Sequence, residues 1–428
     1  MSVVEMLRKL VALGLVAVVA AACSESSPDA DEDDGAVTRI QLQVSGEPEE
    51  TAVYSSIAQQ FQQEHEDIQV EVIEVAEKDD HLARLATSFS GGNPPDVFLV
   101  NFREYSQVVV RGAIESIENH LEGVDTGAYY EPPLEAFTYD GTLQCMPQNI
   151  SSLVVYYNKA LFAEAGLKRP KDGWTWEDFR RTALALTKGD VRGVGIEPTI
   201  IRLAPFAWSA GGDIVDDPEN PTRLDLDNAG ARAALDFFVS LVRDDQVIPT
   251  EEEIAAQELE TRFVTGKLGM MLSSRRDTPA FREVAGLDFD VAPLPVGKEP
   301  AGILHSDAYC VAAGSDAINA AAELVRFATG EEGQTLGALS GRTVPSLTSV
   351  AESGAFLDPV QPPRHSEVFL ESIPHIRRTP VLPTWPEIED VAEQILIRAF
   401  YEDGYTIDDA IEDLDTETRD LFEEALAE

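Results

Sequence analysis

Side chains able to bind a ligand follow several apolar runs that are typical of strands, or lie at the breaks between such runs. These candidates are Glu47, Asn101, Phe102, Arg103, Asn149, Ser151, Glu197, Ser274, Arg276, His305, Asp307 and Arg342. Open α/β sheets bind ligands beyond the carboxyl ends of their strands, so the set should converge on one cleft if the chain folds that way. Taken singly, each can equally be a helix cap, a turn residue or a solvated charge.

Motifs for catalysis are incomplete. Segment 208–211 lacks the glycine that precedes the serine of a nucleophile elbow, and 266–268 lacks the flanking residues of a phosphate-binding loop. Segment 193–198 has proline where a dinucleotide site needs its third glycine, and no second histidine follows 65–67 at the spacing of a zinc-protease helix. The sequence therefore predicts no enzyme, no cofactor and no metal site.

The charge balance is strongly acidic, with 77 Asp and Glu against 32 Lys and Arg and a formal net charge of -45. Such a surface repels nucleic acid and anionic lipid, which disfavours binding to phosphate backbones. Two interpretations stay open. The charge is typical of an extracellular protein adapted to salty surroundings, and it would also suit the capture of a cation.

The N-terminus has the pattern of an export signal. Arg8 and Lys9 precede the apolar run 10–22, which is too short to span a membrane comfortably. The run ends in three alanines followed by Cys23, which resembles a lipobox, although Ala20 stands where leucine is usual. We predict a signal peptide over 1–22, with a lipidated Cys23 and an acidic, disordered tether over 23–36. A plain signal peptide with an incidental cysteine is the alternative.

The first part of the mature chain alternates strands and helices. Alternating apolar residues predict strands over 40–44 and 70–75, and a continuous apolar run predicts a buried strand over 97–100. Helical spacing over 53–61 and 82–89 fills the intervals. This order favours an α/β domain with a mainly parallel sheet.

A second body of α/β structure follows near residue 147, and 428 residues exceed the usual size of one core. A strand is predicted over 153–157 and a helix over 158–165, closed by Gly166. Thr175 has the position of an N-cap with Asp178 three residues later. Ser315 is expected to cap a helix that ends at Gly330, and the stretch 387–428 is strongly helical.

Six segments, read in order, resemble one family. They are 90–98 (SGGNPPDVF), 146–162 with its YYNKALF, 174–179 (WTWEDF), 263–271 (FVTGKLGMM), 292–295 (APLP) and 327–332 (FATGEE). Together with their flanks they span about residues 38 to 400. They are similar to landmarks of the family 1 extracellular solute-binding proteins, the group that contains maltose-binding protein.

The resemblance implies a type II two-lobed α/β fold in which the chain crosses between lobes more than once. One lobe would be 37–148 plus 302–349, and the other 149–301 plus 350–428. A sugar or polyol would bind in the cleft and pass unaltered to an ABC permease with ATPase subunits. The protein would be a monomer, lipid-anchored at the outer face of the cytoplasmic membrane. A secreted glycoside hydrolase, or a lipoprotein that binds peptide or metal, is the alternative.

The resemblance also assigns roles to three kinds of residue. Trp385 is similar in position to an aromatic that stacks on sugar. Trp208 lies in a segment where the family often has a turn, and it is a second candidate for ligand contact, although either ring can pack in a core. Glu197 resembles an acidic position of the family. Cys145 and Cys310 would lie on neighbouring strands, where a disulfide and two buried thiols are both possible.

Overall fold

The computed structural model describes residues 37–46 and 48–426. The predicted signal peptide, lipidated Cys23, tether and Glu47 lie outside these residues.

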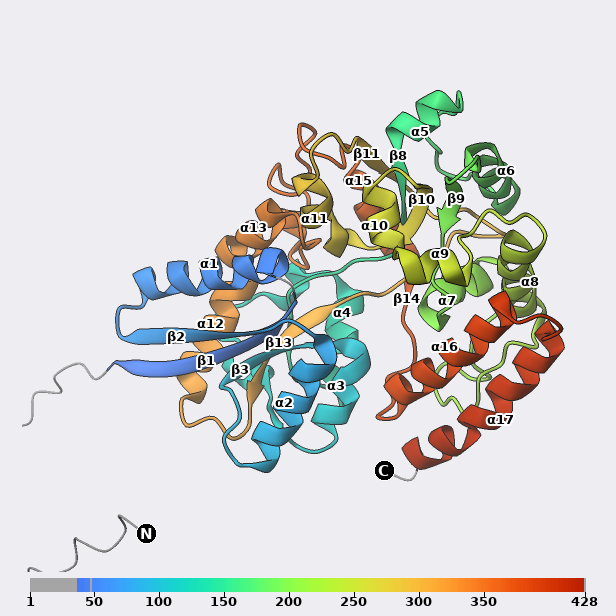
Figure 1. Ribbon diagram of the computed structural model, residues 1–428. Helices are drawn as coiled ribbons and strands as arrows, with labels where there is room; N and C mark the ends of the chain where they lie inside the picture. The colour runs from blue at the N-terminus through green and yellow to red at the C-terminus, as the bar shows by residue number, and fades with distance from the viewer. Residues whose placement is uncertain (1–36, 47, 427–428) are drawn as a thin grey trace, which may run out of the picture. The chain divides into compact units, whose positions relative to one another are not determined.

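A first, six-stranded sheet has the order β2 (Ile68–Val75), β1 (Thr38–Ser45), β3 (Val97–Asn101), β13 (Asp307–Ala312) and β4 (Ile114–Glu115), with β7 (Met146–Pro147) also paired to β13 (Figure 1). Its first three strands confirm the predicted ones.

The first sheet is mixed rather than mainly parallel. Strands β2, β1 and β3 run parallel, but β13 pairs antiparallel with β3, β4 and β7. The difference arises because β13 returns to this sheet from a distant part of the chain, so no crossover helix sets its direction.

A second sheet lies farther along the chain. Its order is β11 (Phe289–Ala292), β8 (Val154–Asn158), β10 (Leu268–Ser273) and β9 (Arg192–Gly195). Strands β10 and β9 are parallel, whereas β8 runs antiparallel to both β10 and β11. Two small ladders join β5 (Thr138–Tyr139) to β6 (Thr142–Leu143) and β12 (Gly302–Ile303) to β14 (Ile376–Arg377).

Helices surround both sheets. Those near the first sheet in sequence are α1 (Pro48–Glu64), α2 (Lys78–Ser90), α3 (Phe102–Val109), α4 (Glu131–Ala136), α12 (Ile318–Thr329), α13 (Glu331–Ser340) and α14 (Thr348–Ala351). The others are α5 (Lys159–Glu164), α6 (Trp176–Leu186), α7 (Ile200–Ser209), α8 (Ala229–Arg243), α9 (Glu251–Ala256), α10 (Leu259–Val264), α11 (Thr278–Glu283), α15 (Glu367–Ser372), α16 (Trp385–Tyr401) and α17 (Ile407–Ala425). Short 3₁₀ helices are η1 (Ile117–His120), η2 (Thr126–Ala128), η3 (Arg275–Asp277) and η4 (Ile373–His375).

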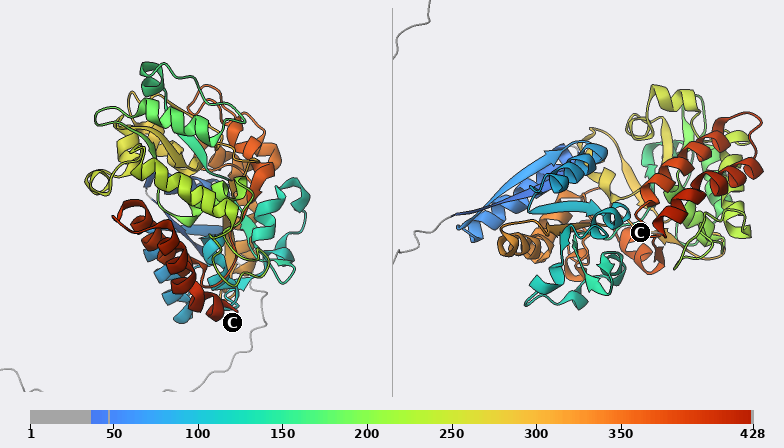
Figure 2. Two further views of the ribbon diagram at one scale, coloured as in Figure 1. Left: turned by 90° about the vertical axis from the view of Figure 1, so that its right-hand side faces the viewer. Right: turned by 90° about the horizontal axis from the view of Figure 1, so that it is seen from below.

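Local signals in the sequence explain several helix ends. Thr175 and Asp178 form the predicted capping box of α6, and Gly166 takes a φ of 68° after α5. The predicted cap Ser315 is wrong, because the N-cap of α12 is Ala317. The Ser315 hydroxyl donates to Asp96 and accepts from the Ala317 amide, just before the helix begins. The C-terminal stretch forms α16 and α17, which pack side by side (Figure 2).

Buried apolar side chains form two clusters that share the second sheet. Along β8, Val154 and Tyr156 belong to the first cluster, whereas Val155 and Tyr157 belong to the second. Successive side chains of a strand point to opposite faces, so a fully buried strand serves both clusters. The first cluster also contains β1, β3 and β13, and the second contains α7, α8, α16 and α17.

Connecting segments run together between the sheets. Ser151 and His305 each donate a backbone N–H to the other's carbonyl oxygen, both at 2.9 Å. The amide of Ile150 donates to Val344 O at 2.9 Å, and that of Leu304 donates to Arg377 O at 2.8 Å. Four stretches of chain that are far apart in the sequence are thus hydrogen-bonded where the chain passes from one sheet to the other.

Candidate functional site

A polar cleft of about 430 Å³ lies at these crossing segments and at the carboxyl ends of strands from both sheets. Ser45, Asn101 and Ser273, which end β1, β3 and β10, all line it. The other lining residues are Gly46, Ala76, Glu77, Lys78, Arg103, Asn149, Ser151, Glu197, Ile201, Arg202, Glu260, Ser274, Arg275, Arg276, Asp277, His305, Asp307, Arg342 and Thr343. This is the edge at which α/β sheets bind ligands.

Most of the sequence-predicted site residues meet in this cleft. Those that line it are Asn101, Arg103, Asn149, Ser151, Glu197, Ser274, Arg276, His305, Asp307 and Arg342. Their proximity makes a shared site possible, and their part in binding stays a prediction.

Three predicted residues are not brought into the cleft. Phe102 is 0% exposed and packs in the first cluster, while Trp208 and Trp385 are 2% and 0% exposed in the second. The indole Nε1 of Trp208 donates to Asp213 Oδ1 at 2.9 Å, and the Arg377 guanidinium lies 4.7 Å from its ring centre. Their rings are therefore occupied by protein packing rather than presented to a ligand. Glu47 lies outside the described residues.

A hydrogen-bonded chain orders the cleft wall on the side of the first sheet. The Asp307 amide donates to Asn149 Oδ1 at 2.8 Å, and Asn101 Nδ2 donates to Asp307 Oδ1 at 3.1 Å. Asn101 is also the N-cap of α3, and its Oδ1 accepts from the amide and the Nε of Arg103 at 3.3 and 3.2 Å. One asparagine thus starts the helix and orients the arginine that follows it.

Glu389 continues this chain from α16. Its Oε2 lies 2.6 Å from Arg103 Nη1, and its Oε1 accepts from Trp385 Nε1 at 2.7 Å. Burial raises the pKa of Glu389, and the Arg103 guanidinium offsets part of that rise. Sequence reasoning missed Glu389, although its spacing of four residues from Trp385 on one helix would have paired the two.

The opposite wall carries a second set of charges. Arg202 Nη2 lies 2.6 Å from Glu197 Oε2, and the Ser273 hydroxyl donates to Asp277. Burial raises the pKa of both Asp277 and Glu260. Their carboxylate oxygens can accept hydrogen bonds from the hydroxyl groups of a ligand, and the arginines of the cleft can donate to such groups. Sequence reasoning missed these residues because Glu260 follows no strand and Asp277 is distinguished only by its burial.

His305 lies where the two walls meet. Its backbone is held by Ser151, and its Nε2 is a buried atom without a hydrogen-bond partner in the described part of the chain. Burial lowers its pKa well below the usual value, and Arg103, Arg202 and Arg276 lower it further. The imidazole is therefore neutral near pH 7, and Nε2 is a buried polar atom with unused hydrogen-bonding capacity on a residue that lines the cleft.

The depressed pKa predicts a pH-dependent contribution of His305 to stability. Below about pH 6.5 the unfolded chain takes up a proton that the folded protein excludes, so this contribution is lost as the pH falls. Urea unfolding of wild type and His305→Gln at pH 7.5, 6.5 and 5.5 should measure it. Their difference in unfolding free energy should fall by about 1 kcal/mol between pH 6.5 and 5.5. A difference that stayed constant would contradict the assignment. Because His81, whose pKa is also lowered, is present in both proteins, it cancels.

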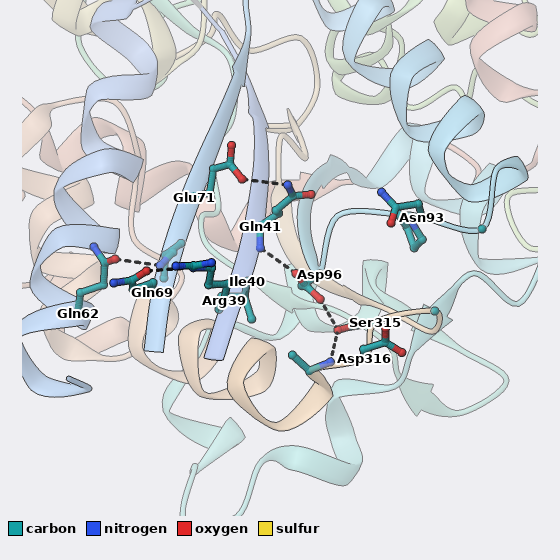
Figure 3. Close-up of a pocket in the computed structure, with 15 residues that line it drawn as sticks. Arg39, Ile40, Gln41, Gln62, Gln69, Glu71, Asn93, Asp96, Ser315 and Asp316 are labelled. Atoms are coloured by element: carbon teal, nitrogen blue, oxygen red, sulfur yellow. Dashed lines mark hydrogen bonds between the residues drawn. The ribbon is translucent and has the colours of Figure 1, made fainter. Parts of the chain in front are cut away.

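A second hollow, of about 650 Å³, lies at the opposite ends of β1 and β2 (Figure 3). Several of its polar groups are bonded to one another: Gln41 Nε2 donates to Glu71 Oε2 at 2.9 Å, and the Gln41 amide donates to Asp96 Oδ2 at 2.8 Å. These groups are already satisfied within the protein, which makes this hollow a weaker ligand site than the cleft.

Neither a membrane-spanning helix nor a metal-binding cluster is found in the described ranges. Within 37–46 and 48–426, no helix combines the length and apolar character needed to cross a membrane. The same residues contain no cluster of three or more His, Cys, Asp or Glu side chains placed to hold a metal ion.

Two α/β halves joined by several crossing segments, with a polar cleft at the crossings, define a class of ligand-binding proteins that close around a guest. The chain belongs to the bacterial extracellular solute-binding proteins, whose family model matches residues 56–362. The predicted family is thereby confirmed.

Individual relatives agree with this assignment. The galactooligosaccharide-binding protein of Bacillus subtilis is 24% identical over 69% of this chain and 70% of its own. An ABC substrate-binding protein of Listeria monocytogenes, solved with cycloalternan, superposes with a TM-score of 0.82 at 23% identity, over 91% of this chain and 99% of its own. A solute-binding protein of Thermotoga lettingae bound to α-D-tagatose gives 0.77 at 21% identity, over 90% and 100%. The predicted two-lobed α/β fold is confirmed.

Proposed function

We propose that this protein captures a sugar or polyol in its cleft and delivers it, chemically unchanged, to an ABC importer. The observation that carries the proposal is the convergence of polar side chains from both sheets and from the crossing segments on one cleft. Named relatives that bind galactooligosaccharide, cycloalternan or tagatose support this ligand class. The permease and ATPase subunits would be its partners.

The charges of the cleft favour an uncharged solute. The cations Lys78, Arg103, Arg202, Arg275, Arg276 and Arg342 are nearly balanced by the carboxyl groups of Glu77, Glu197, Glu260, Asp277 and Asp307. An anionic solute would also have to approach a chain with a formal net charge of -45. Paired guanidinium and carboxyl groups offer donors and acceptors to the hydroxyl groups of a neutral solute.

Closure of the lobes would bury the solute. We assign one lobe to 37–148 plus 302–349 and the other to 149–301 plus 350–428, with the crossing segments as hinges. A solute that contacts both walls binds the closed form better and so shifts the population toward it. The permease would recognise that closed form.

The location follows from the family, whose members are extracellular. We propose in addition that Cys23 is lipidated after removal of 1–22, and that 23–36 tethers a monomeric receptor to the membrane. Mass spectrometry of the membrane-extracted protein should find the lipid on an N-terminal Cys23.

A thermal-shift screen against D-glucose, maltose, cyclic and linear oligosaccharides, and sorbitol tests the function. At least one solute should raise the melting temperature, because a ligand that binds the folded state stabilises it by mass action. Arg202→Ala should abolish the shift, whereas Arg39→Ala, in the second hollow, should retain it. If no solute produced a shift, the ligand class would be wrong, and new reducing ends after incubation with oligosaccharides would instead indicate a hydrolase.

A further inference from the structure

A strip of contacts joins α3, which follows β3 of the first sheet, to α16, which packs in the second cluster (Figure 1). The Arg103–Glu389 ion pair lies at 2.6 Å, and the Ser106 hydroxyl donates to Leu382 O at 2.7 Å. At the exposed end, Gln107 Nε2 lies 3.3 Å from Glu387 Oε1. These interactions form a direct contact between the two lobes, separate from the crossing segments.

The ion pair differs from ordinary surface pairs of this protein in its burial. The Arg103 and Glu389 side chains are 16% and 17% exposed, whereas those of Lys188 and Glu164 are 82% and 68% exposed. Separation of the lobes would return both charges to water, so the pair exists only while α3 and α16 are together. Such buried, hydrogen-bonded pairs are strongly sensitive to the loss of one partner.

Glu389 also fixes an arginine of the cleft wall. Arg103 lines the cleft, and its guanidinium is held by Glu389 on one side and by Asn101 on the other. The second oxygen of Glu389 is held by Trp385, so the carboxylate itself has one orientation. An arginine that is held before the ligand arrives loses less conformational freedom on binding.

We propose that Glu389 is a positioning residue that couples the joining of the lobes to solute binding, by holding Arg103 in the cleft wall across the lobe boundary. This inference rests on the proposed function for its solute and on the α3–α16 contact for its mechanism. Trp385, in the position of a stacking aromatic, then acts through Glu389 rather than by touching the solute.

The test compares Glu389→Gln with the control Glu387→Gln, which removes a charge from the same helix at the exposed contact. Glutamine keeps the shape of Glu389 but has one acceptor oxygen, so it cannot serve both Arg103 and Trp385. Calorimetric titration with the screened solutes should show affinity weakened by about tenfold or more in Glu389→Gln and within about twofold of wild type in the control. Glu389→Asp, which keeps the carboxylate, should lose less solute affinity than Glu389→Gln.

Two readouts without solute separate this inference from the proposed function. Small-angle scattering should give a larger radius of gyration for Glu389→Gln than for wild type or the control. The indole N–H resonance of Trp385 should shift in Arg103→Lys, because Glu389 bonds both side chains and so links them. If no solute binds wild type, the proposed function fails while these readouts still decide the coupling. Unchanged scattering and an unchanged indole resonance, or equal effects in the control, would overturn it.

Discussion

Loss of the disulfide between Cys145 and Cys310 is expected to lower the free energy of unfolding by about 5 kcal/mol, because the bond closes a loop with a sequence separation of 165 residues. Of the two states that the sequence left open for these cysteines, the structure contains the disulfide. Cys145 immediately precedes β7 and Cys310 lies in β13, and both are 0% exposed. The enclosed loop contains the whole second sheet, so the bond restricts the unfolded chain severely. Urea unfolding of Cys145→Ala/Cys310→Ala against wild type measures the effect.

Reduction of wild type provides the control for this prediction. A denaturant series in reducing buffer should reproduce the loss of stability in wild type and leave the double variant unchanged. Solute affinity should be preserved in the variant under native conditions, since neither cysteine lines the cleft. Two free thiols in the mass of the oxidised protein, or equal unfolding free energies, would contradict the prediction.

The first three strands of the first sheet and many residues that line the cleft could be predicted because the relevant signals are local. Alternation in β1, the continuous apolar run of β3 and the capping box at Thr175 depend on neighbouring residues alone. Residues after strand ends were also found, because a strand's end locates the edge of its sheet whatever the rest of the chain does. Asn101 and Arg103 are examples.

The parts that could not be predicted depend on long-range contacts. The direction of β13 is set by the return of the chain from the second sheet, and Ser315 bonds Asp96 rather than capping α12. Glu389 contributes to the cleft through a residue 286 positions away. In each case the local pattern is compatible with more than one outcome, and a distant partner decides.

For Trp385 the sequence left stacking on a ligand and packing in a core both open, and the structure shows the ring packed in a core. Trp385 begins α16, but its ring packs edge-on to Phe422 of α17 at 6.4 Å and its Nε1 bonds Glu389. A sugar-stacking ring must leave one face open, and this ring is 0% exposed. The orientation of the ring is fixed by α17, and the sequence around Trp385 does not predict how α17 packs against α16.

Trp385→Ala is accordingly expected to lower the free energy of unfolding by about 3–5 kcal/mol, the usual cost of removing a large buried aromatic side chain. Trp385→Phe should cost much less, about 1 kcal/mol, because most of the packing survives. Urea unfolding of both variants measures the difference. Trp208→Phe, in the same cluster, is the matched control for loss of an indole donor.

Solute affinity separates the two roles of Trp385. If the indole acts by orienting Glu389, Trp385→Phe should weaken binding as Glu389→Gln does, and the two changes together should weaken it no further, since they break the same chain of bonds. A ring that stacked on the solute would be largely replaced by phenylalanine, and its effect would add to that of Glu389→Gln. Full additivity of the two variants would therefore assign Trp385 to the solute and remove it from the link between the lobes.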